Sequence, residues 1–386
     1  MERLLFTADH DAYRELVKEF VTREVEPNLQ RWDDEHLIDR AVWRAAGKQG
    51  VIGLSVPEEY NGGGQPDYRY QSVVMEEFAK VGAASLISSF SLQDNIVIPY
   101  INDLGTDDQK RRWLPGMATG ELIGAIAMTE PGAGSDLQGV RTTAMRDGDE
   151  WVINGQKTFI TSGINADFVI VVARTETEAS AQGLSLIVVE TGTPGFTRGR
   201  KLDKVGLHAQ DTAELFFDFA RVPAGNLLGE EGRGFVHLME RLPLERMSIA
   251  TSALASAEAI FTETKRYCFE RKAFGRAIGD FQNSRFVLAE IATELDVTRA
   301  YHDAAVVALN NGELTGTDAA KAKWWATELQ KRVIDRCLQL HGGYGYVLEY
   351  PVAKAFVDSR IQTIYGGTTE IMKEIIGRDL ARSEHN

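Results

Sequence analysis

A glycine-rich turn is the first place in this sequence where the residue types suggest binding chemistry. Residues 123–136 (IGAIAMTEPGAGSD) place a threonine, a serine and backbone amides in a turn that follows a short apolar run. Glycines let a main chain approach a ligand closely, and such a turn can contact a flat ring or an anion. Because glycine-rich turns are common between strands, this turn alone indicates a binding loop without identifying the ligand.

Two arginines further along the chain could each bind a phosphate group, but not the same one. Arg246 and Arg271 are separated by 25 residues. If residues 242–271 form one helix, a rise of ~1.5 Å per residue places the two arginines about 37 Å apart. The two side chains must then serve separate ends of the molecule.

Other catalytic and cofactor motifs are missing from the sequence. The segment GAGSDL at 132–137 has leucine where a dinucleotide fingerprint needs its third glycine, and no Walker A loop, HExxH, GxSxG or EF-hand loop occurs. The seven histidines are scattered, and Cys268 and Cys337 lack metal-ligand spacing. We expect no metal site, and we expect both cysteines to be reduced thiols in a core.

The chain around these motifs divides into three segments of different texture. Apolar residues recur at helical spacing through residues 1–120, short β-branched runs separated by turns fill residues 121–229, and long helical periods return in residues 230–386. In the last segment, Leu288, Ile291 and Leu295 share one helix face. Long apolar stripes joined by short turns are typical of a four-helix bundle. We therefore predict a helical domain, a β domain and a helical bundle, in that order.

Composition limits the partners and the location. The 386 residues include 42 basic and 56 acidic side chains, and the formal net charge of −14 repels the phosphate backbone of a nucleic acid. No window approaches ~18 uncharged apolar residues, so we expect no membrane span. The first residues (MERLLFTADH) carry charges and lack the apolar stretch of a signal peptide. We expect a cytoplasmic protein, with a processed mitochondrial matrix form as the alternative.

Four further motifs follow the glycine-rich turn. They are KTFITSG at 157–163, RKAFG at 271–275, QLHGGYG at 339–345 and IYGGTTE at 364–370. In this order, and in segments of matching texture, the set resembles the acyl-CoA dehydrogenase family over essentially the whole chain. The C-terminal motifs are most similar to the long-chain branch of that family.

The resemblance implies a fold, a cofactor and a reaction. The expected fold is multi-domain α+β, with an N-terminal α-helical domain (1–120), a central β-barrel-like domain (121–229) and a C-terminal four-helix bundle (230–386). The expected enzyme uses FAD to desaturate an acyl-CoA thioester to the trans-2-enoyl-CoA, with flavin N5 accepting the C3 hydride. The resemblance also implies fatty acid β-oxidation of medium to long chains, an electron-transferring flavoprotein as electron acceptor, and a homotetramer built as a dimer of dimers.

Site residues are carried over from the family position by position. Positions that contact FAD correspond to Met128, Thr129, Ser135, Phe159, Thr161, Arg271, Phe274, Gln282, Gln339, Gly342, Gly343, Thr368 and Glu370. Positions on the substrate side correspond to Ser135, Arg246 and Gly366. The family assigns Arg271 to the FAD of a neighbouring subunit and Arg246 to the thioester of its own chain, which agrees with the spacing of the two arginines.

The reaction needs one carboxylate beside C2, and here the sequence departs from the common family pattern. Most members carry that acid where this chain has Gly366, which has no side chain. Long-chain and isovaleryl-type members carry a glutamate immediately before the arginine that matches Arg246. Glu245 is therefore the predicted base, with a pKa raised toward neutrality by burial, and Gly366 keeps an N–H for the thioester oxygen. Glu370 is the second candidate.

Two alternative functions stay open. An isovaleryl-type, branched-chain dehydrogenase shares the helix position of the acid, and the missing side chain at position 366 also fits a flavin-binding subunit without turnover in a mixed oligomer. Small side chains at Ser88, Ser89 and Ser91 predict room at the floor of an acyl pocket. The polar run from Gln93 to Asn95 has no place in this hypothesis.

Overall fold

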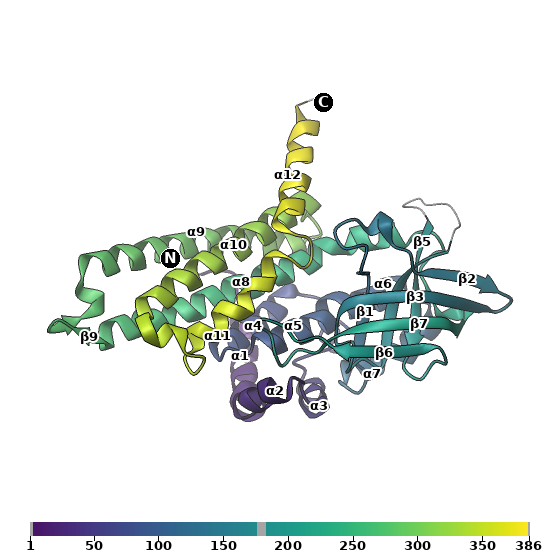
Figure 1. The fold of residues 1–386 in the computed structure, drawn as a ribbon, viewed down its shortest axis with the longest axis horizontal. Coiled ribbons are helices and arrows are strands. Elements are labelled where there is room, and N and C mark those ends of the chain that lie inside the picture. Colours follow the sequence, from purple (N-terminus) through teal and green to yellow (C-terminus); the bar gives the residue numbers. More distant parts are fainter. Residues whose placement is uncertain (1–2, 176–182, 385–386) are drawn as a thin grey trace.

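The computed structural model describes residues 3–175 and 183–384. N-terminal helices, a β domain and long C-terminal helices follow one another along the chain, and the long helices extend away from the β domain (Figure 1). The predicted multi-domain α+β architecture is confirmed.

The N-terminal part is helical and packs around an aromatic core. Phe20, Trp43, Phe78 and Phe90 are buried together in this core, because each lies on the apolar face of its helix. Thr106 accepts a hydrogen bond from the backbone N–H of Gln109 and so caps the last helix of this part. The helices are α1 (Ala8–Phe20), α2 (Leu29–Glu35), α3 (Arg40–Lys48), α4 (Tyr68–Lys80), α5 (Ala84–Leu92), α6 (Ile98–Leu104) and α7 (Asp107–Ala118).

The β domain is a mixed sheet of eight strands within the described residues, in the order β6-β7-β3-β2-β4-β5-β8, with β1 paired to β4. The antiparallel pairing of β3 with β7 shifts register between Lys157 and Ile160, which marks a β-bulge. The strands are β1 (Gly124–Ala127), β2 (Thr143–Asp147), β3 (Glu150–Thr161), β4 (Phe168–Arg174), β5 (Leu184–Glu190), β6 (Phe196–Lys201), β7 (Thr212–Pro223) and β8 (Leu227–Leu228).

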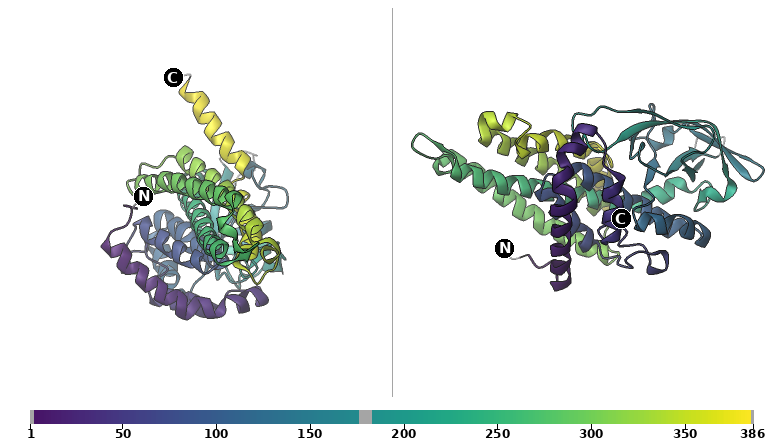
Figure 2. Two further views of the ribbon diagram at one scale, coloured as in Figure 1. Left: turned by 90° about the vertical axis from the view of Figure 1, so that its left-hand side faces the viewer. Right: turned by 90° about the horizontal axis from the view of Figure 1, so that it is seen from below.

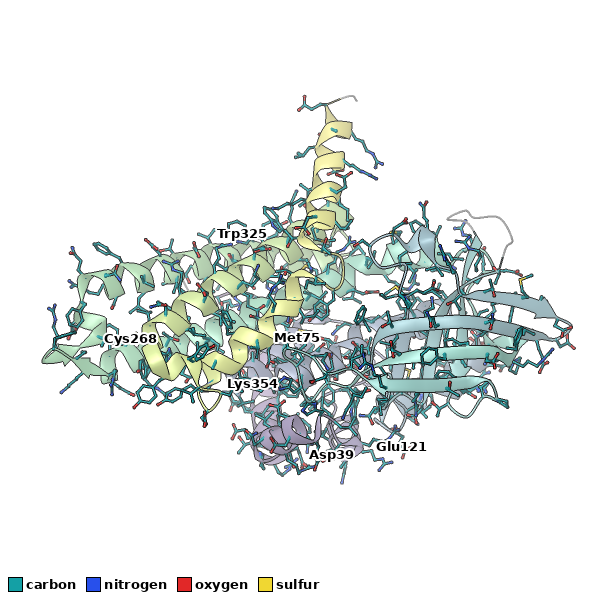
Figure 3. All side chains as sticks on the ribbon, viewed as in Figure 1. Asp39, Met75, Glu121, Cys268, Trp325 and Lys354 are labelled. Atoms are coloured by element: carbon teal, nitrogen blue, oxygen red, sulfur yellow. The ribbon has the colours of Figure 1, made fainter. Side chains whose placement is uncertain are left out.

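The C-terminal part combines three long helices with two shorter ones. α8 (Gly234–Glu270), α9 (Gln282–Asn310) and α10 (Gly316–His341) pack along one another, and α11 (Pro351–Asp358) lies against α8 and α10. The short strands β9 (Lys272–Ala273) and β10 (Arg276–Ala277) form a hairpin after α8. Both cysteines are free and buried, with Cys268 near the β9 end of the bundle (Figure 3).

The last helix, α12 (Thr369–Ser383), starts against α10 and then projects from the body of the molecule (Figures 1 and 2). Leu380 on its outer part is 62% exposed. An apolar side chain on a projecting helix favours contact with another chain, since little of this chain covers it.

Candidate active site

A cavity of about 1180 Å³ opens among the N-terminal helices, the β domain and the bundle. Its wall includes parts of α5, the loop after β1, the end of β3, α8 as far as Ile260, and residues 364–368. These segments are distant in sequence, and the fold brings them to one space. The predicted site residues that line it are Met128, Thr129, Ser135, Phe159, Thr161, Glu245, Arg246, Gly366 and Thr368.

Glu245 places a buried carboxyl group on the cavity wall. Its side chain is 3% exposed, and the Tyr100 hydroxyl donates a hydrogen bond to its Oε1 at 3.2 Å. Burial raises the pKa of Glu245 to about 7, against the opposing effects of the Tyr100 hydrogen bond and the positive charge of Arg246. A carboxyl group with this pKa can both take up and release a proton near neutral pH.

Gly366 lies against the same face of α8 as Glu245. A Cβ atom added to Gly366 would come within 2.3 Å of Cδ1 of Ile249, and residues four apart on a helix share a face. Gly366 also has φ +62°, a left-handed conformation that disfavours side chains. Among the residues that the structure describes, no protein acceptor takes the Gly366 N–H. The glycine therefore offers a free amide beside the helix face that carries the carboxyl group.

Arg246 adds to this wall a cation that forms no salt bridge within the described residues. The side chain is buried, its Nε has no hydrogen-bond partner in the described part of the chain, and burial lowers the pKa of Arg246 while the charge of Glu245 opposes that effect. A guanidinium group stays protonated even then. Its donors are thus available to an oxygen of a bound molecule.

A buried ion pair holds the glycine-rich loop in place. Lys157 Nζ donates to Glu130 Oε1 at 2.9 Å and to the carbonyl of Met128 at 3.1 Å. The carboxylate of Glu130 also accepts the backbone N–H groups of Arg141 and Thr142. Burial lowers the pKa of Lys157 to about 8, against the charge of Glu130. Because every member is hydrogen-bonded, the network fixes the loop that presents Met128 and Thr129 to the cavity.

The β-bulge in β3 turns an aromatic ring toward the cavity. Phe159 lies inside the bulge with φ +58° and is 67% exposed. A positive φ is unusual at a bulky residue and is held here by the bulge. With Thr161 on the same wall, the exposed ring provides an apolar face next to a hydroxyl group, which suits a flat ring with polar edges.

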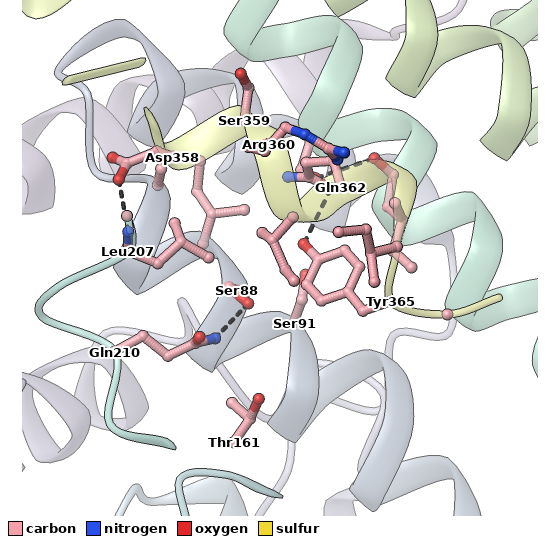
Figure 4. Close-up of a pocket in the computed structure, with 18 of the residues that line it drawn as sticks. Ser88, Ser91, Thr161, Leu207, Gln210, Asp358, Ser359, Arg360, Gln362 and Tyr365 are labelled. Carbon is pink, nitrogen blue, oxygen red and sulfur yellow. Dashed lines mark hydrogen bonds between the residues drawn. The ribbon is translucent and has the colours of Figure 1, made fainter. Parts of the chain in front are cut away.

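The far part of the cavity wall carries polar groups that bind each other. Gln210 donates to the Ser88 hydroxyl, and the Tyr365 hydroxyl donates to Gln362 Oε1 at 3.0 Å (Figure 4). Of the three serines expected at the pocket floor, Ser88 and Ser91 line the cavity. Ser89 is buried on another side of α5 and does not line it. Since these polar groups are paired, this wall can accept an apolar chain.

The polar run from Gln93 to Asn95 serves the fold. It belongs to a π-helical turn, Gln93–Val97. Gln93 Oε1 accepts the Gly124 N–H at 3.0 Å, and Asp94 Oδ1 accepts the Gly53 N–H at 2.8 Å. These contacts tie α5 and α6 to the first strand and to the N-terminal helices.

The remaining predicted residues lie outside the cavity, in two places. Glu370 is exposed at the start of α12, where a backbone hydrogen bond and then the Thr368 side chain lower its pKa. The other residues gather at the far end of the bundle, beyond α8, and Phe274 there is 95% exposed. This second group consists of Arg271, Phe274, Gln282, Gln339, Gly342 and Gly343.

Family models match almost the whole length of the chain. The acyl-CoA dehydrogenase N-terminal domain matches residues 7–121, the middle domain residues 125–220 and the C-terminal domain residues 232–381. The chain belongs to the acyl-CoA dehydrogenase family. This member is an oxidoreductase by family, as the sequence predicted.

Relatives and solved structures agree along the chain. Long-chain specific acyl-CoA dehydrogenase of Sus scrofa is 48% identical over 99% of this chain and 89% of its own length. An acyl-CoA dehydrogenase from Geobacillus kaustophilus has a TM-score of 0.96 at 47% identity, covering 98% of this chain and 100% of the other. A glutaryl-CoA dehydrogenase of Mycobacterium smegmatis, in complex with FADH2, has a TM-score of 0.91 at 28% identity, covering 97% and 95%.

Neither a membrane-spanning helix nor a metal-binding cluster occurs among the residues that the structure describes. No helix described there is long and apolar enough to cross a membrane. In the same ranges, no cluster of three or more His, Cys, Asp or Glu side chains could bind a metal ion.

Sequence reasoning missed the residues that support this acyl-CoA dehydrogenase site from behind. Tyr100 lies on α6, 145 residues before Glu245 in the chain, and Ile249 and Lys157 act through contacts that no motif spacing reveals. The sequence did contain one signal of the ion pair. Glu130 and Lys157 are charged residues beside a glycine-rich segment and a β-branched segment, respectively.

Proposed function

We propose that this chain is an FAD-dependent dehydrogenase of medium-chain to long-chain acyl-CoA thioesters. Its product is the trans-2-enoyl-CoA. The observation that carries the proposal is the buried carboxyl group of Glu245 on the helix face that contacts Gly366. At position 366, where most of the family has its acid, the left-handed backbone and the nearby Ile249 side chain leave no room for a side chain. The carboxyl group of Glu245 lies one helical turn before Ile249 on α8.

Glu245 removes the C2 proton in this proposal. Its raised pKa matches the task, because a base with a pKa near the working pH balances its ionised fraction against its basicity. Tyr100 orients the carboxylate by its hydrogen bond to Oε1. The exposed Glu370, with its lowered pKa, is less suited, since it lies outside the cavity.

Gly366 stabilises the negative charge that develops on the thioester oxygen as the C2 proton leaves. Its N–H lies on the cavity wall with no protein acceptor in the described ranges, and a fixed donor at a developing charge lowers the barrier. Arg246 contributes a positive charge on the same wall. Ser135, from the glycine-rich loop, lines the route of the CoA arm.

The residues present fit FAD in two places. Phe159, Thr129 and Thr161 suit the flavin ring, and Thr368 lies at the N-terminus of α12, where free amides favour a phosphate group. At the bundle end, Gly342 and Gly343 have open space where side chains would be. Arg271, Phe274, Gln282 and Gln339 complete that group. When bound, FAD accepts the hydride from C3, so that the C2–C3 double bond forms.

The second group lies at the C-terminal end of α8, whereas Glu245 and Arg246 lie on the N-terminal half of that helix. α8 separates Arg246 from Arg271, about 37 Å at ~1.5 Å per residue. We therefore propose that each FAD lies between two chains of a homotetramer, with Glu370 and Thr368 from one chain and Arg271 from another. An electron-transferring flavoprotein is the proposed acceptor, as is usual in the family.

The shape of the cavity supports a long acyl chain. Its lining includes Ser88, Ser91, Asp33 and Lys354 as well as Glu245, and Lys354 Nζ lies 3.2 Å from Asp33 Oδ2. The cavity as a whole is lined mostly by apolar groups. A short acyl chain would leave much of that apolar surface uncovered.

The test is an anaerobic titration of the purified holoenzyme with straight acyl-CoAs of increasing length and with isovaleryl-CoA, monitored at the flavin band. We expect bleaching. In a separate steady-state assay with an electron acceptor, we expect the highest kcat/KM among medium to long straight chains. Preference for isovaleryl-CoA would favour the branched-chain alternative. A yellow protein that no acyl-CoA bleaches would contradict the proposal and favour a subunit without turnover.

A further inference from the structure

A buried lysine lies directly behind the Gly366 turn. Lys323, on α10, is 0% exposed and is among the largest fully buried side chains of the described chain. Its Nζ donates to the carbonyl oxygen of Gly367 at 2.6 Å. Lys323 does not line the cavity; it reaches the cavity wall only through this carbonyl group.

The burial of Lys323 is not explained by an ion pair. No carboxylate lies within salt-bridge distance of its Nζ in the described part of the chain, although Glu328 and Glu370 act on it at longer range. Burial, and then the positive charge of Arg246, lower its pKa to about 7. A buried amine without a carboxylate partner is costly, so the hydrogen bond to Gly367 has a role that outweighs the cost.

The turn that Lys323 contacts is one that needs an external anchor. Gly366 and Gly367 have φ +62° and +97°, and consecutive glycines have the greatest conformational freedom of any residues. A second tether between α10 and this segment comes from Thr369, whose hydroxyl donates to Glu328 Oε1 at 2.8 Å. Together the two contacts fix the turn against α10.

We propose that Lys323 is a positioning residue, which acts through the Gly367 carbonyl to hold the Gly366 N–H in place for the thioester oxygen. The inference depends on the proposed function. The 2.6 Å hydrogen bond from Lys323 Nζ fixes the Gly367 carbonyl whether the amine is charged or neutral, and a donor stabilises a developing charge only when its position is fixed beforehand. The chemical role of Lys323 is therefore to keep the C2 proton of the bound thioester acidic.

The experiment compares wild type, K323M, K323R and the control K321M, all as FAD-loaded holoenzymes. Lys321 lies on the same helix, but its side chain is 44% exposed and pairs with Asp318. Stopped-flow reduction by the best acyl-CoA gives the rate and the Kd. A 3-thia-acyl-CoA, which can lose its C2 proton but has no C3 hydride, separately reports the pKa of C2–H through the absorbance of its bound enolate.

We expect K323M to lower the reduction rate about 10-fold to 100-fold, to change the Kd by less than about threefold, and to raise the pKa of the bound C2–H. K323R should recover part of the loss, and K321M should match wild type. Amide hydrogen exchange of residues 364–368 should be faster in K323M alone. A wild-type rate and C2 acidity in K323M would overturn the assignment, as would a loss confined to FAD content or Kd.

If K323M does not accumulate as holoenzyme, K323R and K323Q are compared by the same measurements. A higher rate and a more acidic C2–H in K323R support the assignment, and equal values overturn it. If no acyl-CoA bleaches the flavin of the wild-type enzyme, the proposed function itself is wrong. If the wild-type flavin is bleached and K323M behaves like wild type, only the role of Lys323 is wrong.

Discussion

At the scale of single residues, the chemistry depends on a carboxyl group whose surroundings set its pKa. Burial raises the pKa of Glu245 to about 7 and the Tyr100 hydroxyl opposes that rise. The two effects have different origins, because burial disfavours the charged form whereas the hydrogen bond favours it. Removing the hydroxyl should therefore shift the titration without removing the base.

We predict that Tyr100→Phe moves the acid limb of the kcat/KM profile to higher pH, by about one unit. The sign follows from the loss of a hydrogen bond to the ionised carboxylate: the pKa rises, and a higher pH is needed to deprotonate the base. The control is Tyr13→Phe, since Tyr13 donates to the Gly50 carbonyl in the N-terminal helices. A limb that stays in place, or moves to lower pH, would show that Tyr100 does not act on the base.

The sequence could predict the residues that lie in continuous motifs, and not those that act across the fold. Glu245, Gly366 and the glycine-rich turn are each recognisable from neighbours in the chain. Tyr100 and Lys323 contact the site from helices far away in sequence, and their residue types are common in ordinary cores. Their roles depend on distances of 3.2 Å and 2.6 Å that only the folded chain sets.

At the scale of elements, the site depends on how closely α8 packs against the glycine turn before α12. Gly366 adopts φ +62° and leaves no room beside Ile249 Cδ1. The single helix that the spacing of the two arginines presupposes through residues 242–271 is present as far as Glu270, where α8 ends. The positive φ values at Phe159 and Gly366 could not be predicted, since they follow from the neighbouring elements.

We predict that Gly366→Ala lowers the melting temperature, through backbone strain of about 1 to 2 kcal/mol, and lowers the rate of flavin reduction about 10-fold to 100-fold by displacing the amide. Gly312→Ala is the matched control, because Gly312 has φ +71° with no atom near an added Cβ. Gly312→Ala should lower the melting temperature through the same backbone strain and leave the rate of flavin reduction unchanged.

The cause of the extra loss in Gly366→Ala can be tested by Ile249→Val, which removes the single methyl group that an added Cβ at position 366 would meet. The double variant should regain part of the rate lost by Gly366→Ala. If the fold-change in rate of the double variant equals the product of the fold-changes of the two single variants, the two positions do not interact.

At the scale of the whole molecule, the site residues form two groups at opposite ends of α8. The domain texture could be predicted from the period of the apolar residues. The arrangement of chains could not, because it depends on surfaces such as the projecting α12 and the exposed Phe274. The length of α8 supports the proposal that a ligand held by both groups joins two chains.

We predict complementation between Glu245→Gln and Arg271→Ala chains. Each variant alone should have little activity, one for lack of the base and the other for weak FAD binding. In randomly mixed oligomers, about a quarter of the sites combine an intact Glu245 from one chain with an intact Arg271 from another. Activity near that fraction supports a shared site, and no recovery in mixed oligomers would place both residues in one chain's site.

The role of Glu245 is tested most directly by single-turnover flavin reduction under anaerobic conditions in Glu245→Gln. The matched control is Glu240→Gln, on the same helix but exposed, and Glu370→Gln tests the second candidate. We predict normal FAD content in Glu245→Gln and Glu240→Gln, a loss of about 10²-fold to 10⁴-fold in the reduction rate of Glu245→Gln, and a near-normal rate per bound FAD in the other two variants. Reduction of Glu245→Gln at the wild-type rate, with a large loss in Glu370→Gln, would contradict the account.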